Sequence, residues 1–354
     1  MSLSIESITT SPIDENLKSK AQLLEKKLLK FCKLEELYYE DIPLKSNPQI
    51  YHHTLRSKFN PEKPTFILCH GHVGSSTNFI SLAKYLLPRY NLFIPDTIGT
   101  ALSSRPNNIK FTSSEQSINF FIDILHEFIL SLNLPNKYFI GGHSLGGLFV
   151  ANYSLKYPDN IEKVLLLSPA GISDVKLYGG NIHNESGFFR GILLKLFWCV
   201  KCFEPTIQNV YNNILFRPMF KLSLRKRYDV SSELNEIFSQ LTEIAMEYPN
   251  DLDKSLFYVF NYPFPSGAIP AERKLLEESN LKYVICFGEI DWMDQCGSRR
   301  LEEKCPQRFK VYTISKKGHR FALENPKETF DVIDLIIIFI NYIYHYIITS
   351  SFYF

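Results

Sequence analysis

The sequence lacks the marks of several large classes of protein. Its 354 residues contain no glycine-rich phosphate loop, no cysteine pairs with zinc-site spacing and no internal repeat. Basic and acidic residues nearly balance, and the formal net charge of +2 is too small to favour a nucleic-acid partner. With 45% hydrophobic residues, the chain is long and apolar enough for one large domain or a core domain with a sizeable insertion.

The amino-terminal residues lack the apolar run of a secretory signal. Residues 1–20 carry Glu6, Asp14 and Glu15 instead. Seven cysteines, an odd number without such a signal, favour reduced thiols and a cytoplasmic location. Cys199 and Cys202 have redox-motif spacing, but no strand is predicted before them, so we interpret the spacing as incidental.

Hydrophobic patterning predicts an alternation of strands and helices. Six apolar runs predict buried strands, at residues 65–69, 92–95, 137–140, 164–167, 283–287 and 309–313. Helices are predicted at residues 25–40, 114–132 and 148–157, between the last two strands, and after Pro326. This alternation is typical of βαβ units, and hence of a mostly parallel sheet with helices on both faces. Functional residues should gather at the carboxyl ends of its strands.

The alternation stops for about a hundred residues and then resumes, which predicts an inserted cap. We expect four segments: an N-terminal helical extension at 1–44, the first part of the α/β core at 45–171, a cap or lid insertion at 172–270, and the second part of the core with an apolar C-terminal helix at 271–354.

The strongest chemical signal is Gly142-His143-Ser144-Leu145-Gly146. It follows a predicted strand immediately and precedes a predicted helix. A nucleophile elbow requires this context, because a sharp strand-to-helix turn raises the serine hydroxyl above the sheet and glycines relieve the crowding. We predict that Ser144 is the nucleophile.

A serine hydroxyl needs a base, and the base needs an orienting acid. On this fold the chain order is serine, acid, histidine. His319 follows the last predicted strand and is the predicted base, although it could be a surface-loop histidine. Asp291 follows the preceding strand and is the predicted acid, with Glu289 and Asp294 as alternatives.

The reaction also needs donors for the developing oxyanion. One should be the backbone amide of Leu145, which follows the nucleophile. The other should come from the loop after strand 65–69, and we assign it to the His72 amide, with Val73 as the neighbour to check. The His72 side chain could instead line the pocket, and His70 is expected to be a structural hydrogen-bonder.

Together, the elbow, the His70-Gly71-His72 loop, Asp291-Trp292-Met293-Asp294 and Gly318-His319 resemble the α/β-hydrolase superfamily. More narrowly, residues 45–340 resemble the subfamily of α/β-hydrolase-domain proteins 4 and 5 and their plant and fungal relatives. The resemblance implies the α/β-hydrolase fold and action on glycerophospholipids, as phospholipase, lysophospholipase, cardiolipin deacylase or lysophosphatidic acid acyltransferase. One branch lacks the nucleophile and is a lipase co-activator; Ser144 is present here, which implies an active hydrolase.

The sequence departs from the subfamily pattern at two places. The acyltransferase motif is histidine, four residues, then aspartate, whereas His319 is followed at that spacing by Glu324. A carboxylate remains, but the acyltransferase reading is weakened. Asp96-Thr-Ile-Gly99-Thr-Ala101 replaces the usual Asp-x-x-Gly-x-Gly loop, which bears on the local backbone and leaves the triad intact.

Two segments raise the question of a lipid surface. Residues 188–201 interleave bulky apolar residues with Arg190, Lys195 and Lys201, and residues 225–227 are basic, which suits a lipid interface or a buried cap helix with solvated lysines. Residues 335–354 lack charged side chains, and we interpret them as a last helix packed on the core, with membrane docking as the alternative.

We therefore predict a serine esterase of the lipase type that cleaves acyl esters of phospholipids or lysophospholipids through an acyl-serine intermediate. It needs no metal or organic cofactor. Its expected partners are the lipid substrate and a peripheral membrane or lipid-droplet surface, without nucleic acid. The alternatives are a lysophosphatidic acid acyltransferase, a non-enzymatic lipid-binding co-activator, and a small-molecule esterase or peptidase on the same fold.

Overall fold

The computed structural model describes residues 4–174, 211–212, 217–225, 227–248, 251–261 and 266–334. Several sequence features lie outside the described residues: the apolar-basic segment 188–201, the Cys199/Cys202 pair, Lys226 in the basic cluster, and the uncharged tail 335–354. Within the described part of the chain, every helix is too short or too polar to span a bilayer.

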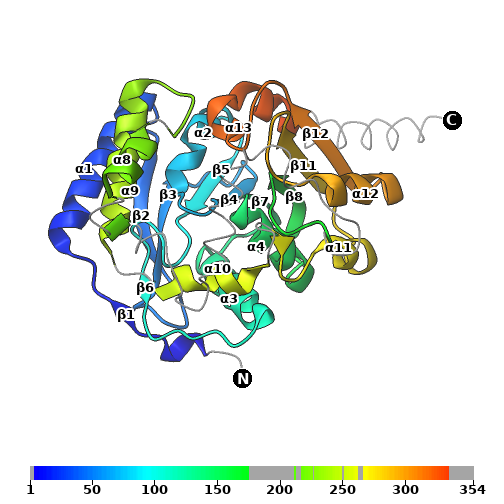
Figure 1. The fold of residues 1–354 in the computed structure, drawn as a ribbon, viewed down its shortest axis with the longest axis horizontal. Coiled ribbons are helices and arrows are strands. Elements are labelled where there is room, and N and C mark those ends of the chain that lie inside the picture. The colour runs from blue at the N-terminus through cyan, green and yellow to red at the C-terminus, as the bar shows by residue number, and fades with distance from the viewer. Residues whose placement is uncertain are drawn as a thin grey trace.

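An eight-stranded sheet forms the centre of the molecule (Figure 1), in the order β12-β11-β8-β7-β4-β5-β3-β2. Its strands are β2 (Leu37–Pro43), β3 (Tyr51–Ser57), β4 (Thr65–Cys69), β5 (Asn91–Pro95), β7 (Tyr138–His143), β8 (Ile161–Leu167), β11 (Tyr283–Gly288) and β12 (Phe309–Ile314). The six strands from β12 to β5 are parallel, and β3 and β2 add an antiparallel edge.

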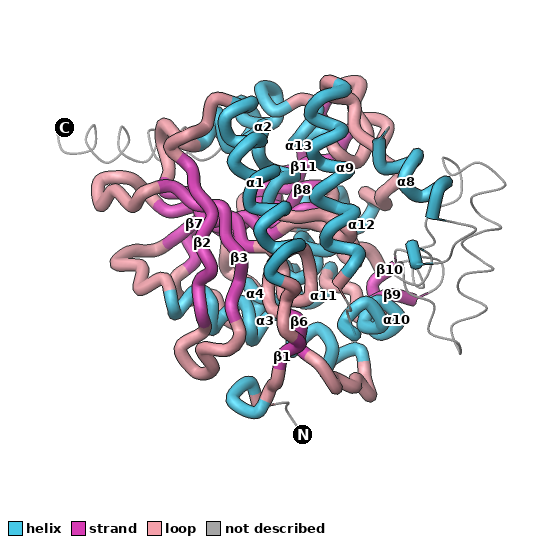
Figure 2. The backbone as a smooth tube through the Cα atoms, turned by 90° about the vertical axis from the view of Figure 1, so that its left-hand side faces the viewer, coloured by secondary structure: helices cyan, strands magenta, loops and turns pink. Residues whose placement is uncertain are grey.

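Helices cover both faces of the sheet (Figures 1 and 2). They are α1 (Glu15–Cys32), α2 (Ile80–Leu86), α3 (Ser114–Ser131), α4 (Leu145–Lys156), α8 (Arg217–Arg225), α9 (Ser232–Glu247), α10 (Leu256–Val259), α11 (Glu272–Glu278), α12 (Cys296–Lys304) and α13 (Phe321–Glu324), and residues 326–334 are also helical. Along β4, Phe66 and Leu68 join the core under α1 and α2, whereas Ile67 and Cys69 join the core under α3 and α4. Successive side chains point to opposite faces of the sheet, and helices cover both faces. The buried strands are therefore apolar on both faces.

The predicted fold class is confirmed, and all six predicted strands are present. The predicted helix at residues 25–40 is wrong at its end. The helix begins at Glu15 and stops at Cys32, because Lys33 adopts a left-handed conformation (φ 56°, ψ 50°) and the Leu34 amide donates to the Leu29 carbonyl. Residues 37–43 then form β2, which the sequence analysis did not predict.

An inserted region separates β8 from α11 and contains α8, α9 and α10. The chain leaves and re-enters the core at one place, since the Ala271 amide donates to the Gly171 carbonyl and the Glu272 amide to the Ile172 carbonyl. A Cβ on Gly267 would lie only 2.7 Å from the Gly171 Cα, so the two backbones touch. The segment boundaries at 44, 171 and 270 stay predictions; β2, which precedes residue 45, is part of the main sheet.

A buried charge network attaches α1 to β2 and β3. His53 Nδ1 lies 2.5 Å from Asp41 Oδ1, and His53 Nε2 lies 3.1 Å from Glu25 Oε1 on α1. Lys18 Nζ completes the network, 2.9 Å from Asp41 Oδ2. Since both ring nitrogens face carboxylates, the imidazole donates from both when it is protonated. Burial alone would lower the pKa of His53, but the bonds to Asp41 and Glu25 raise it to about 10.

This network predicts a pH-dependent stability. The folded pKa of His53 lies above the unfolded value of about 6.5, so its contribution is complete below about pH 6.5 and is lost as the pH rises through about 10. We expect the free energy of unfolding to fall over this range in the wild type and to fall less in His53→Gln. Urea titrations at several pH values measure it. His126→Gln is the control, because burial lowers the pKa of His126 and its loss should leave the alkaline slope intact; equal slopes in wild type and His53→Gln would contradict the prediction.

Candidate active site

The carboxyl ends of the parallel strands bring six polar side chains to one edge of the sheet. They are His70 after β4, Asp96 after β5, Ser144 after β7, Ser168 after β8, Asp291 after β11 and His319 after β12. Because parallel strands end at the same edge, residues far apart in the chain meet there.

Ser144 lies in a sharp turn between β7 and α4, and its backbone conformation is strained. Its φ of 56° and ψ of −117° are costly for a residue with a Cβ. Hydrogen bonds hold the turn: the Ser144 amide donates to the Leu167 carbonyl (2.9 Å), and its carbonyl accepts from the Ala170 amide (3.0 Å). A Cβ on Gly142 would lie 2.3 Å from the Gly146 carbonyl oxygen, and a Cβ on Gly146 would lie 2.4 Å from the Cys69 carbonyl oxygen, so neither position has room for a side chain. The turn has the geometry of a nucleophile elbow.

His319 is bound to Asp291, as a base is to its orienting acid. His319 Nδ1 lies 3.1 Å from Asp291 Oδ1. Asp291 also accepts hydrogen bonds from the Met293 amide (3.0 Å) and from the Ser168 hydroxyl. Burial would raise the pKa of this carboxyl, but His319 and the other two donors outweigh burial and hold the pKa below its usual value. Asp291 is therefore ionised at neutral pH.

The two alternative acids are engaged elsewhere. Glu289 Oε2 accepts from the Lys316 amide at 2.7 Å, and Asp294 Oδ1 accepts from the Cys296 amide at 3.3 Å. The observed partner of the His319 ring is Asp291, which favours Asp291 among the three candidates.

His143 places the backbone of His319 beside the elbow. Its Nε2 lies 2.7 Å from the His319 carbonyl oxygen, and the two rings are 4.7 Å apart. Burial, followed by the charge of His319, lowers the pKa of His143 to about 3, so the ring is neutral and carries its proton on Nε2 to donate this bond. The Trp292 ring lies 4.9 Å from the His319 ring. His319 is thus held through both its side chain and its backbone.

The loop at residues 70–74 lies against the elbow. A Cβ on Gly71 would sit 2.9 Å from the Ser144 Cβ. His70 Nε2 accepts from the Thr97 amide, so Nδ1 carries the proton and donates to the Gly71 carbonyl at 2.8 Å. That carbonyl also accepts from the Gly74 amide at 3.1 Å, which closes a turn around His72. The bonds of the His70 ring fit the expected structural role.

The turn at residues 71–74 fixes the orientation of the His72 amide, the predicted oxyanion donor. Val73 completes the turn with φ 53°, a conformation that a β-branched residue rarely adopts. The His72 side chain points away to the inserted region, where its Nε2 lies 3.9 Å from Asp253 Oδ1. Leu145, the other predicted donor, is the first residue of α4, so its amide is one of the free amides at a helix N-terminus.

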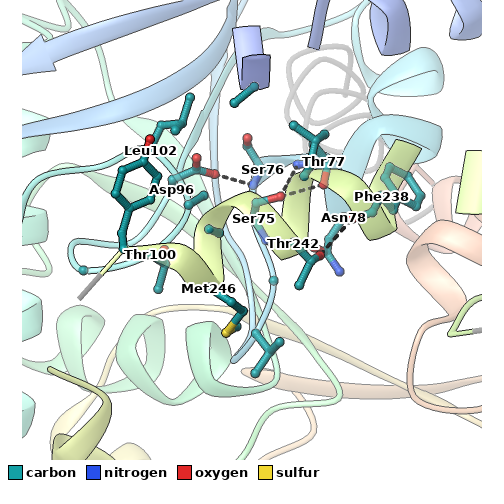
Figure 3. Close-up of a pocket in the computed structure, with 18 of the residues that line it drawn as sticks. Ser75, Ser76, Thr77, Asn78, Asp96, Thr100, Leu102, Phe238, Thr242 and Met246 are labelled. Atoms are coloured by element: carbon teal, nitrogen blue, oxygen red, sulfur yellow. Dashed lines mark hydrogen bonds between the residues drawn. The ribbon is translucent and has the colours of Figure 1, made fainter. Parts of the chain in front are cut away.

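A small cavity lies behind the 70–74 loop, next to the loop after β5 and to α9 (Figure 3). Phe238, Thr242 and Met246 of α9 line it opposite Ser75–Asn78. Its volume of about 60 Å³ has room for a few waters and is far below the ~300–1,000 Å³ of typical ligand pockets. Arg105 lines the cavity, is buried, and has no hydrogen-bond partner for Nε and Nη1 among the described residues. We interpret the cavity as a site for water rather than for an acyl chain.

The departure from the Asp-x-x-Gly-x-Gly pattern falls at a conformation that suits glycine. Gly99 has φ 81°, and Ala101, in place of the second glycine, has φ 43°. The alanine therefore pays the cost of a left-handed backbone. The loop keeps its shape because the Gly99 amide donates to the Ser104 carbonyl (2.9 Å) and Arg105 Nη2 donates to the Ala101 carbonyl (2.8 Å).

Two residues at the site were not predicted from sequence. Ser168 follows β8 directly, so its position at a strand end was a signal that could have identified it. His143 is one of the two variable residues of the Gly-x-Ser-x-Gly motif, and nothing in the sequence indicates its hydrogen bond to a residue 176 positions away.

Comparisons with known proteins agree with this geometry. A family model described as the alpha/beta hydrolase fold matches residues 64–195. Lipase 1 of Psychrobacter immobilis is 33% identical over 269 residues, which are 75% of this chain and 74% of the lipase. The chain belongs to the α/β-hydrolase family.

Other members of the α/β-hydrolase family confirm the narrower resemblance. The rat 1-acylglycerol-3-phosphate O-acyltransferase ABHD5 is 30% identical over 285 residues, 75% of each chain. A probable 1-acylglycerol-3-phosphate O-acyltransferase of rice is 24% identical over 279 residues, 74% of this chain and 64% of the rice protein, so the chain spans less than two thirds of that relative. A crystal structure of a membrane phospholipase A, 17% identical, superposes with a TM-score of 0.67 over 90% of this chain and 91% of that one, which shows the shared fold. This α/β hydrolase is thus related to lipases and ABHD5-like acyltransferases.

The geometry of this α/β hydrolase predicts that Asp291 is the acid required for hydrolysis. Asp291→Asn removes the charge that stabilises and orients the imidazole, and we expect kcat to fall by about 10⁴-fold. Asp294→Asn and Glu289→Gln are matched controls and should retain activity. Hydrolysis of a soluble p-nitrophenyl ester measures all three. A large loss in either control with a mild loss in Asp291→Asn would assign the acid elsewhere.

The position of His143 predicts a second effect. His143→Phe removes the donor to the His319 carbonyl, so the base is held less accurately and kcat should fall by about tenfold or more at nearly constant KM. His143→Gln keeps a donor and should lose less. Because the pKa of His143 is about 3, the ring does not titrate near neutrality, and the pH profile around pH 7 should keep its shape. A shifted profile would instead make His143 a titrating participant.

Proposed function

We propose that this protein is a serine esterase of the lipase type that cleaves acyl esters of phospholipids or lysophospholipids. The observation that carries the proposal is the Asp291–His319 hydrogen bond, set beside the strained elbow at Ser144. A buried, ionised carboxylate on one ring nitrogen leaves the other nitrogen free to act as base.

The proposed reaction passes through an acyl-serine intermediate. Ser144 Oγ attacks the ester carbonyl carbon while His319 Nε2 takes its proton. The amides of Leu145 and His72 donate to the oxyanion that forms. His319 then gives the proton to the departing alcohol oxygen, which leaves the acyl group on Ser144. Water, deprotonated by His319, releases the fatty acid and restores the serine.

The names of the relatives support a lipid ester as substrate. One relative is a lipase, two are named as 1-acylglycerol-3-phosphate O-acyltransferases, and a structure with the same fold is a phospholipase A. All four names describe the handling of acyl chains. We accordingly propose that the protein works at a peripheral membrane or lipid-droplet surface.

Acyl transfer to a lysophospholipid is the second candidate, and the names of two relatives favour it. It would use the same acyl-serine, with a lysophospholipid hydroxyl in place of water. The contact of Glu324 argues against it: Glu324 Oε1 accepts from the Asp229 amide at 3.1 Å, so the carboxylate at the motif position anchors the inserted region. The intact site residues argue against a purely non-enzymatic co-activator.

The deciding experiment uses wild type, Ser144→Ala and Ser315→Ala with mixed vesicles of phospholipid, lysophospholipid and triacylglycerol. We expect fatty acid release from phospholipid or lysophospholipid by wild type and by Ser315→Ala, an exposed-serine control. Release by Ser144→Ala should fall by about 10⁴-fold or more, because no nucleophile remains. Mass spectrometry identifies the products. Newly acylated lysophospholipid would support the transferase, and equal inactivity of all three proteins would contradict both enzymatic readings.

A further inference from the structure

The outer face of α1 combines lysines with exposed apolar side chains. Buried residues of α1 are Ala21, Glu25, Leu28 and Leu29. Opposite them, at helical spacing, the exposed residues include Lys20, Leu23, Lys26, Lys27, Lys30 and Phe31, which we call the α1 outer face. Leu23 is 70% exposed and Phe31 40%, both unusual for large apolar residues. In Figure 2, α1 runs along the side of the molecule nearest the viewer.

The lysines of the α1 outer face carry uncompensated charge. Among the described residues none of the four has an acidic partner within ion-pair distance, whereas Lys18, on the inner side of the helix, pairs with Asp41. Three of the four acidic residues of the neighbouring α9 pair with α8: Glu236 with Arg225, Glu243 with Lys221 and Glu247 with Arg217. Glu15, at the first position of α1, is the exposed acid of this helix.

The α1 outer face stands on a firmly attached helix. The Asp14 side chain caps its N-terminus, accepting from the Asn16 and Leu17 amides at 2.9 and 3.0 Å. Glu25 attaches the middle to His53, and Lys33 closes the C-terminus. A rigid helix loses little conformational freedom when it binds a partner, so its exposed side chains are available at low entropic cost.

We propose that the α1 outer face docks on the surface of an anionic lipid bilayer. Four lysines and two apolar side chains on one side of a helix match the two parts of such a surface, anionic headgroups and the acyl boundary beneath them. An acidic protein groove or a nucleic acid would pair with the lysines but leave Leu23 and Phe31 without an apolar partner. This surface is independent of the candidate active site and of the segments 188–201 and 335–354.

The test is vesicle flotation of the full chain with phosphatidylcholine alone and with added phosphatidylserine. One variant combines Lys26→Gln, Lys27→Gln and Lys30→Gln, and a second combines Leu23→Ser and Phe31→Ser. The matched control combines Leu130→Ser, an exposed residue in the last turn of α3, and Lys137→Gln, an exposed residue just before β7. Thermal melting confirms that the variants are folded, which is expected because all these side chains are exposed.

We expect wild type and control to bind phosphatidylserine vesicles, with an affinity that falls as salt is raised. The triple lysine variant should bind at least about tenfold more weakly, and Leu23→Ser/Phe31→Ser should also bind more weakly. Hydrolysis of a soluble ester should be equal in wild type, the control and the two α1 variants. Ser144→Ala should bind vesicles like wild type, so docking is measured independently of catalysis. The proposal is overturned if the lysine variant or the Leu23→Ser/Phe31→Ser variant binds like wild type, or if wild type binds the two kinds of vesicle equally or binds neither.

Discussion

The contact between the Ser144 turn and the loop after β4 is the constraint on which the rest of the site depends. Strands β7 and β4 are neighbours, so the elbow and the 70–74 loop emerge side by side. They can touch only where side chains are absent: a Cβ on Gly146 would lie 2.4 Å from the Cys69 carbonyl oxygen, and one on Gly71 would meet Ser144 itself. The strained backbone of Ser144 costs about 1–3 kcal/mol, and the surrounding hydrogen bonds stabilise it. This packing is what can aim the amides of His72 and Leu145 at one point.

The second constraint is a buried carboxylate that must stay charged. Removing Asp291 from water is costly unless its oxygens receive donors, and three elements supply them: His319 after β12, Ser168 after β8 and the Met293 amide in its own turn. His143, in strand β7, then links His319 to the elbow through a hydrogen bond to the His319 carbonyl. Each member of the predicted triad is therefore held by a residue in, or just after, a strand other than its own, so the site geometry depends on the register of the parallel sheet.

The parts of this arrangement that sequence predicts are those with local causes. Buried parallel strands are apolar throughout, so β4, β5, β7, β8, β11 and β12 were visible, and Ser144, Asp291 and His319 could be singled out as strand-end residues. β2 and β3 were not predicted because neither is an apolar run: β2 is a half-exposed edge strand that carries Glu40, and β3 is largely buried but carries polar residues such as His53. The helix ends at Cys32 because Lys33 adopts a left-handed conformation, and a lysine gives no indication of that conformation in the sequence. Ser168 and His143 act through bonds to residues 123 and 176 positions away, and such partners exist only after folding.

The inserted region contacts both the loop that carries His319 and the N-terminal end of helix α1. Arg320 Nη1 donates to the Arg227 carbonyl at 2.8 Å, and Lys317 pairs with Asp229, so the residues on both sides of His319 are attached to the segment that precedes α9. At its other end α9 meets α1, where the Tyr248 hydroxyl donates to the Asp14 carbonyl at 3.3 Å. These hydrogen bonds and ion pairs connect helix α1, helix α9 and the loop that carries His319 in one series. A lipid surface bound at α1 would therefore determine, through this series of contacts, how the candidate active site is oriented towards its substrate.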